Sequence, residues 1–162
     1  MKKFELTTES ITNEAGKKLF RIKALIDFGD VKAGEPGGYV EKEGNVSQDD
    51  NAWVSGNAKV YDNAWVSGNA RVSGDARVSG DALVFGDADY ALVQGFGTEF
   101  RCTTFYRGKD KKIMVNCGCF HGNLEAFRKQ AKETRSGKIA KEYLMIADLM
   151  EYHFASEDSS DE

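Results

Sequence analysis

The sequence predicts a mainly β protein of stacked short parallel strands, with a β-hairpin before them and a small α+β segment after them. Three observations lead to this prediction. From Val54 the chain reads in sixes as VSGNAK, VYDNAW, VSGNAR, VSGDAR, VSGDAL and VFGDAD. Residues 4–28 alternate apolar and polar side chains, as strands do. Residues 124–154 carry apolar side chains at the three-to-four-residue spacing of helices.

The first predicted element is the hairpin. Phe4 and Leu6 alternate before a turn at residues 13–16, and Phe20 to Phe28 then alternate along a second strand. Turn residues between two alternating runs are typical of a hairpin. We expect this hairpin to cover one end of the stacked strands, because an open strand edge needs protection.

The six-residue repeat is the central element. Val recurs at every sixth position from 54 to 84, and Ala recurs four residues after each Val. A helix would need apolar residues every three to four positions, which this segment lacks. Each six therefore predicts one short strand followed by a Gly, Asn or Asp corner, since these residues tolerate positive φ. Val then points inward, and the small Ala fits inside the corner.

The pattern aliphatic-x-x-x-small-x resembles the hexapeptide repeat of left-handed β-helices, best known from acyltransferases. The resemblance covers residues 53–88 closely and residues 31–52 more loosely. It implies three strands per coil, so that residues 18 apart stack, and it implies a homotrimer. The expected fold class is thus mainly β, a left-handed parallel β-helix with an N-terminal β-hairpin cap and a C-terminal α+β appendage.

The expected domains follow this order. They are an N-terminal β cap over residues 1–30, the left-handed β-helix over 31–95, a hairpin plus two helices over 96–155, and a disordered acidic tail over 156–162. The second hairpin is predicted at residues 100–106 and 112–120. Asn123 is a predicted helix cap, and a second helix is expected from Ile139 to Phe154.

With three strands per coil, the outward side chains fall on three faces. The first carries Trp53, Ser55, Arg71 and Ser73, the second Lys59, Tyr61, Arg77 and Ser79, and the third Trp65, Ser67, Leu83 and Phe85. The third face is the apolar one. Because large exposed apolar patches mark interfaces, we predict that Trp65, Leu83 and Phe85 form the oligomer interface. The alternative is that the C-terminal helices dock on them.

The first two faces place cations beside aromatic rings. Rings stack on bases, and cations pair with phosphates. In a trimer, neighbouring faces would meet across a cleft. The pattern therefore predicts a site for a small anionic nucleotide-type ligand, formed by Trp53, Lys59, Tyr61, Arg71 and Arg77.

A second resemblance covers nearly the whole chain. The segments FGDV and GGYV, the VSGNA repeats, the CGCF strand and the KEYLMIADLMEYHF helix resemble small phage and prophage proteins of Gram-positive bacteria. This resemblance implies a phage context. The leading functional hypothesis is a phage-encoded, non-enzymatic protein in the cytoplasm of the infected host. It would sequester a nucleotide-type signalling molecule of bacterial antiviral defence.

Two alternatives stay open. One is a coenzyme A-dependent acyltransferase, which the hexapeptide resemblance implies and which would need a histidine as general base. The repeats contain no histidine, and nothing in the sequence places His121 beside them. We therefore assign no catalytic residue. The other alternative is a structural or protein-binding trimeric scaffold.

Other chemistry is not expected. Cys102, Cys117, Cys119 and His121 could supply three thiolates and an imidazole for zinc, but alternate positions on one strand favour core packing, so no metal or cofactor is predicted. The basic residues of the first helix alternate with glutamates, which is typical of a solvated face, so nucleic acid is not an expected partner. Three cysteines favour a reduced compartment, and no apolar run long enough for a membrane span is present.

Overall fold

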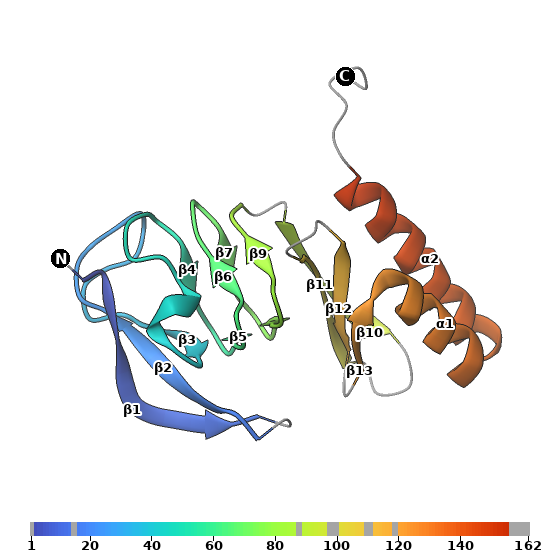
Figure 1. Cartoon of the computed structure of the whole chain (residues 1–162), viewed down its shortest axis with the longest axis horizontal. Helices are drawn as coiled ribbons and strands as arrows, with labels where there is room; N and C mark the ends of the chain where they lie inside the picture. The colour runs from blue at the N-terminus through green and yellow to red at the C-terminus, as the bar shows by residue number, and fades with distance from the viewer. Residues whose placement is uncertain are drawn as a thin grey trace, which may run out of the picture.

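The computed structural model describes residues 2–13, 16–86, 89–96, 101–108, 112–117 and 120–155. Three parts follow one another along its long axis (Figure 1): the N-terminal strands, the repeats, and a C-terminal sheet with two helices on its far side. The predicted disordered tail over 156–162 lies outside the described residues. The domain boundaries stay a prediction.

The N-terminal hairpin is confirmed. Strands β1 (Phe4–Thr12) and β2 (Lys18–Ala24) pair antiparallel, with Phe4 opposite Ala24. Strand β3 (Pro36–Val40) pairs antiparallel with β2 and parallel with one repeat strand, in which Lys59 and Val60 are its partners. The hairpin therefore continues directly into a mixed sheet with the order β1-β2-β3-β5-β8, in which β5 (Lys59–Val60) and β8 (Arg77–Val78) belong to the repeats.

Each described repeat strand is two residues long, because a Gly, Asn or Asp corner follows at once. The strands are β4 (Trp53–Val54), β5 (Lys59–Val60), β6 (Trp65–Val66), β7 (Arg71–Val72), β8 (Arg77–Val78) and β9 (Leu83–Val84). They pair parallel as β4 with β7, β5 with β8 and β6 with β9. Residues 18 apart are thus partners, as the repeat predicted.

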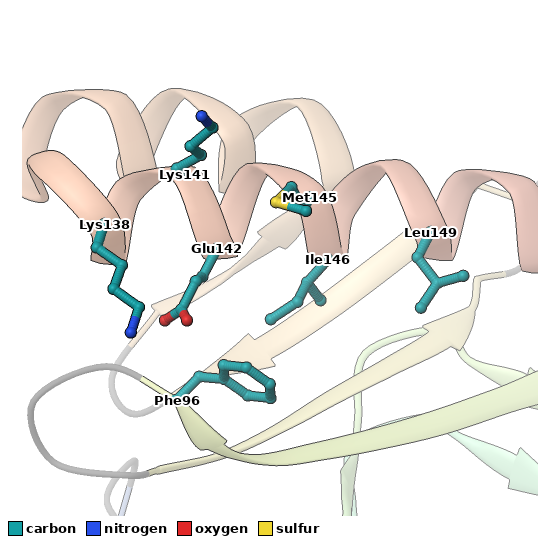
Figure 2. A pocket seen from close by; sticks show the side chains of 7 residues that line it. All are labelled: Phe96, Lys138, Lys141, Glu142, Met145, Ile146 and Leu149. Atoms are coloured by element: carbon teal, nitrogen blue, oxygen red, sulfur yellow. The ribbon is translucent and has the colours of Figure 1, made fainter.

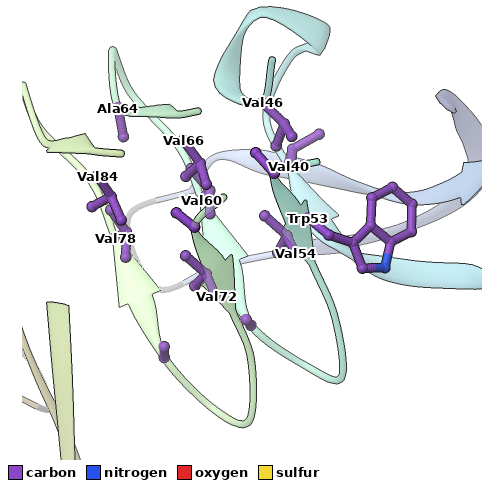
Figure 3. Packing of buried hydrophobic residues seen from close by; sticks show 14 of the residues in the cluster. Val40, Val46, Trp53, Val54, Val60, Ala64, Val66, Val72, Val78 and Val84 are labelled. Atoms are coloured by element: carbon purple, nitrogen blue, oxygen red, sulfur yellow. The ribbon is translucent and has the colours of Figure 1, made fainter. Parts of the chain in front are cut away.

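The valines point into one common core (Figure 3). Val54, Val60, Val66, Val72 and Val84 are each 0% exposed. The corner alanines of the described repeats are also buried. Val points inward and Ala fits inside the corner, as predicted from their positions.

The predicted fold class, a mainly β left-handed parallel β-helix, is wrong. The described residues form several small separate sheets, mixed and antiparallel, together with two helices, and no continuous parallel β-helix. The physical reason is the small number of repeats. Six repeats give each face only two strands of two residues, so β4–β7 and β6–β9 remain two-stranded. The flanking segments then add antiparallel strands instead of further coils.

The C-terminal part is an antiparallel sheet of order β10-β11-β12-β13. Its strands are β10 (Tyr90–Phe96), β11 (Arg101–Arg107), β12 (Ile113–Cys117) and β13 (Phe120–Asn123). The hairpin of β11 and β12 is confirmed. Strand β10 was not predicted from the sequence, and β13 was not distinguished from the strand before it.

Both predicted helices are present. Helix α1 (Leu124–Thr134) begins at Asn123, whose side chain accepts a hydrogen bond from the Ala126 amide at 2.8 Å. Helix α2 (Gly137–Phe154) follows after Ser136. Its buried residues are Tyr143, Ile146, Ala147, Met150 and Phe154, which recur at the spacing expected of one helix face. They share a second core with α1 and the C-terminal sheet.

Polar side chains close the N-terminal end of the stack. Lys3 is buried, and its Nζ donates to the carbonyls of Asp50 and Ala52 at 2.8 and 2.6 Å. Burial lowers the pKa of Lys3 to about 8, against the opposing effect of the Asp50 and Asp49 carboxylates. Asn45, within the short 3-10 helix η1 (Glu43–Asn45), donates to the Ala64 carbonyl at 2.9 Å. These contacts satisfy backbone groups that the short ladders leave open.

Candidate functional site

Lys59 lies on β5, Arg77 lies on β8, and Tyr61 follows β5 by one residue; we call this set the cationic strand face. Lys59 and Arg77 are parallel partners in the ladder, and all three side chains are partly buried. The Lys59 Nζ donates to the Asn57 carbonyl at 3.3 Å. The structure therefore brings together three of the five predicted ligand-binding residues.

Trp53 does not belong to this surface, and the expectation of an outward indole was wrong. Its side chain is 1% exposed. The ring makes edge contacts with Phe28 and Phe4, at centroid distances of 5.2 and 6.2 Å. The N-terminal segment folds over the first repeat strand and covers this ring. Trp53 is therefore a core residue that no ligand can stack on.

Arg71, the ladder partner of Trp53, is exposed and makes an ion pair with Asp30 at 2.5 Å. The Arg71 hydrogen bond lowers the pKa of the Asp30 carboxyl. The Arg71 carbonyl also accepts the Tyr90 hydroxyl at 2.6 Å. Arg71 thus contacts the N-terminal segment and β10, and it lies on a different sheet from the cationic strand face.

The predicted interface residues Trp65, Leu83 and Phe85 are all exposed, and we call this set the apolar strand face. Their exposed fractions are 39%, 44% and 67%. Trp65 and Leu83 are parallel partners in β6 and β9, and Phe85 follows β9 by one residue. The described C-terminal helices pack on their own sheet and not on this face. Its role as an oligomer interface stays a prediction.

The C-terminal sheet joins the repeats through polar side chains that the sequence analysis did not identify. The backbone N–H of Arg77 donates to the Thr104 hydroxyl at 2.9 Å, and the side-chain amide of Asn116 donates to the Arg77 backbone carbonyl at 2.8 Å. Asn116 also donates to the Ser79 hydroxyl at 3.1 Å. These side chains satisfy the open edge of β8. Nothing in the sequence around Thr104 or Asn116 indicates these contacts, because they join segments that are far apart along the chain.

His121, on β13, lies close to the repeats, a position that the sequence alone did not indicate. Its Nε2 is 2.9 Å from the Tyr106 hydroxyl, and a Cβ added at Gly80 would be 3.7 Å from the imidazole. Burial raises the pKa of Tyr106 to about 12, so this phenol stays protonated. Ser79 and Tyr106 are buried. These contacts join the repeats to the C-terminal sheet. For the acyltransferase alternative, the only imidazole near the repeats among the described residues already has its Nε2 in contact with Tyr106.

Asp62 occupies a corner where the other described repeats have glycine, with a φ of 61°. Its carboxylate accepts hydrogen bonds from Lys17 Nζ at 2.8 Å and from the Gly80 amide at 3.0 Å. Burial raises the pKa of this carboxyl, but the bonds from Lys17 and Gly80 outweigh that effect and lower it. Asp tolerates left-handed backbone better than most residues. The carboxylate therefore ties the hairpin turn and two successive coils to one corner.

The cysteines serve packing in the described part of the chain. Cys117 is buried, and its Sγ accepts the Thr103 hydroxyl at 3.1 Å. Burial raises the pKa of the Cys102 thiol. Cys119 lies outside the described residues. Among the residues that are described, no group of three or more His, Cys, Asp or Glu side chains could hold a metal ion.

Comparison with known proteins supports the repeat and nothing beyond it. The model of the YdcK beta solenoid repeat matches residues 64–78. The chain therefore carries β-solenoid repeats, although the matched segment is a small part of its length. A search of curated proteins found no match. Across the described residues, neither helix combines the length and apolarity needed to cross a membrane.

Proposed function

We propose that the chain is a non-enzymatic scaffold that assembles with copies of itself through the apolar strand face. The observation that carries this proposal is the row of Trp65, Leu83 and Phe85 on one strand pair, each with over a third of its surface exposed. Fully burying an exposed apolar side chain contributes about 1.5–3 kcal/mol, and these three, which are already partly buried, contribute a part of that each. The hexapeptide resemblance implies three copies.

The backbone beneath this face supports the proposal. The Trp65 amide donates to the Ala82 carbonyl and the Ser67 amide to the Val84 carbonyl, both at 2.9 Å. The inward side chains of these strands, Val66 and Val84, are fully buried. A face held in this way loses little conformational freedom on association, which favours binding.

Replacing Phe85 with glutamate should break the contact that copies of the chain make through the apolar strand face. The change puts a charge at the most exposed position of the row, where association would bury it without a partner. Light scattering after size exclusion should give a multiple of the single-chain mass for the wild type and a clearly lower mass for Phe85→Glu. Ser73→Glu, at an exposed position on a neighbouring sheet, is the control and should keep the wild-type mass. A stable assembly should form well below a protein concentration of roughly 100 μM, which is about 100 times a micromolar Kd. A wild-type mass of one chain at that concentration would refute the proposal.

A second candidate is the sequestration of a small nucleotide-type molecule, as the phage resemblance suggests. The observation that favours it is the register of Lys59 and Arg77, with Tyr61 one residue after β5. Two cations and a ring on a rigid ladder suit a phosphate and a base. In this proposal the protein acts in the cytoplasm of an infected bacterium, on a signal of antiviral defence. The apolar strand face then holds the three copies whose cationic faces form clefts.

Loss of one cation should weaken this binding. A charge-assisted hydrogen bond to phosphate contributes about 1.5–3 kcal/mol, so Arg77→Ala or Lys59→Ala should raise Kd by roughly 10- to 100-fold. The measurement is calorimetric titration with cyclic nucleotides and ADP-ribose-type molecules. Arg71→Ala is the matched control and should bind as the wild type does, since Arg71 lies on another sheet. An equal loss of affinity in Arg71→Ala and Arg77→Ala would show that the site is not the cationic strand face. Absence of binding to the wild type would exclude this candidate function.

A further inference from the structure

Helix α2 has a second apolar face that the C-terminal core does not use. Met145, Leu149 and Tyr152 are 61%, 58% and 83% exposed. They follow one another at four and three residues, so they form one row along the helix. The row borders a groove of about 580 Å³ between α2 and the end of β10, lined by Phe96, Ile146 and Leu149 among others. Figure 2 shows Phe96 beneath the helix with Ile146 and Leu149 pointing toward it.

The charges along α2 run against its dipole. Lys138 lies in the first turn, which holds no acidic residue, and Lys141 follows in the next. Asp148 and Glu151 lie toward the C-terminal end, whereas Glu142 follows Lys141 directly and His153 lies in the last turn. Anions are favoured near a helix N-terminus and cations near its C-terminus, so this order costs free energy in the single chain. A second helix running antiparallel would reverse the arrangement, because each basic end would meet an acidic end.

We propose that α2 pairs antiparallel with α2 of a second copy, around a two-fold axis near Met145. Lys138 and Tyr152 are each seven residues from Met145, two helical turns away. Around this axis Lys138 of one copy meets Tyr152 of the other, as a cation over an aromatic ring. Lys141 and Asp148 share one flank of the row, four residues before and three after Met145, so they meet across the axis as an ion pair.

The acidic side of this pairing is held in place. Arg128 of α1 donates to Asp148 at 2.9 Å and also contacts Glu151 and Glu125. One guanidinium therefore contacts three carboxylates, which leaves this group of four side chains with a net charge of −2 that a cation of the partner copy can balance. The pairing is isologous, as most two-fold contacts are. It goes beyond the proposed scaffold, because it uses a different surface from the apolar strand face.

Disulfide trapping tests the axis. In the proposed pairing residue 145 meets its own copy, so Met145→Cys should form a cross-linked dimer under mild oxidation. Tyr152→Cys is the matched control: the two copies of residue 152 would lie roughly 21 Å apart along the helix, beyond disulfide reach. The wild type reports any background from native cysteines. Efficient cross-linking of Tyr152→Cys with none of Met145→Cys would overturn the proposed axis.

Charge exchange tests the pairing independently. Lys141→Asp or Asp148→Lys should each raise the dimer Kd about 10-fold or more. The double variant, in which the two charges are exchanged, should recover affinity. Circular dichroism checks that the helices are intact in every variant. The same measurements in a Phe85→Glu background separate the two surfaces. If α2 pairs as proposed, the double variant Met145→Cys with Phe85→Glu still cross-links, whether or not the apolar strand face assembles. Failure to cross-link together with failure of the double variant to recover would show that this face takes another partner or none.

Discussion

Replacing Val72 with aspartate should leave the chain insoluble or unfolded. Val72 is 0% exposed and pairs with Val54 in the ladder of β4 and β7. Each coil buries its valine only against its neighbours. A carboxylate there would lose its hydration without gaining a partner, which costs several kcal/mol. This is a large share of the roughly 5–15 kcal/mol that stabilises a whole domain.

The neighbouring Ser73 supplies the control. Its side chain is exposed, because successive residues of a strand point to opposite sides. Ser73→Asp should therefore be soluble and melt within a few degrees of the wild type. Thermal unfolding followed by circular dichroism makes the comparison. A soluble Val72→Asp protein with the wild-type melting temperature would show that the repeat register is wrong.

Replacing Asn116 with leucine should have the second largest effect. Leucine has a similar size, but it removes the donor that reaches the Arg77 carbonyl at 2.8 Å and the Ser79 hydroxyl at 3.1 Å. A buried polar group left without a partner costs about 1–3 kcal/mol. With two such groups affected, we expect the free energy of unfolding to fall by about 2–4 kcal/mol.

Urea denaturation can measure this loss, and limited proteolysis can locate it. Cleavage should appear first between β9 and β10 if the seam between the repeats and the C-terminal sheet is weakened. Asn69→Leu is the matched control, because Asn69 lies in an exposed repeat corner, and it should change stability little. An Asn116→Leu protein as stable as Asn69→Leu would mean that this seam is not held by the polar network.

The repeat itself could be predicted because its information is local. Val at every sixth position, with Gly or Asn between, determines which side chains point inward and which residues are partners. The hairpin and the helices were predicted for the same reason, since alternation and three-to-four-residue spacing are visible in a short window. Asn123 was recognised from its residue type and position alone.

Contacts between distant segments could not be predicted. Whether Trp53 is outside or buried depends on Phe4 and Phe28, which reach it from another part of the chain. His121 approaches Gly80 only because β13 pairs with β12 and β12 meets the repeats. The parallel β-helix was predicted from a repeat that continues for too few coils. In each case the local pattern was correct, and its surroundings decided the outcome.

The accessibility of Trp65 tests the proposed assembly most directly. The chain has two tryptophans, and Trp53 is buried, so quenching of fluorescence by acrylamide reports mainly on Trp65. We predict that quenching decreases as protein concentration rises, whereas Phe85→Glu is quenched strongly at every concentration. Quenching of the wild type that equals that of Phe85→Glu up to the highest concentration would contradict the account, because the apolar strand face would then remain open to solvent.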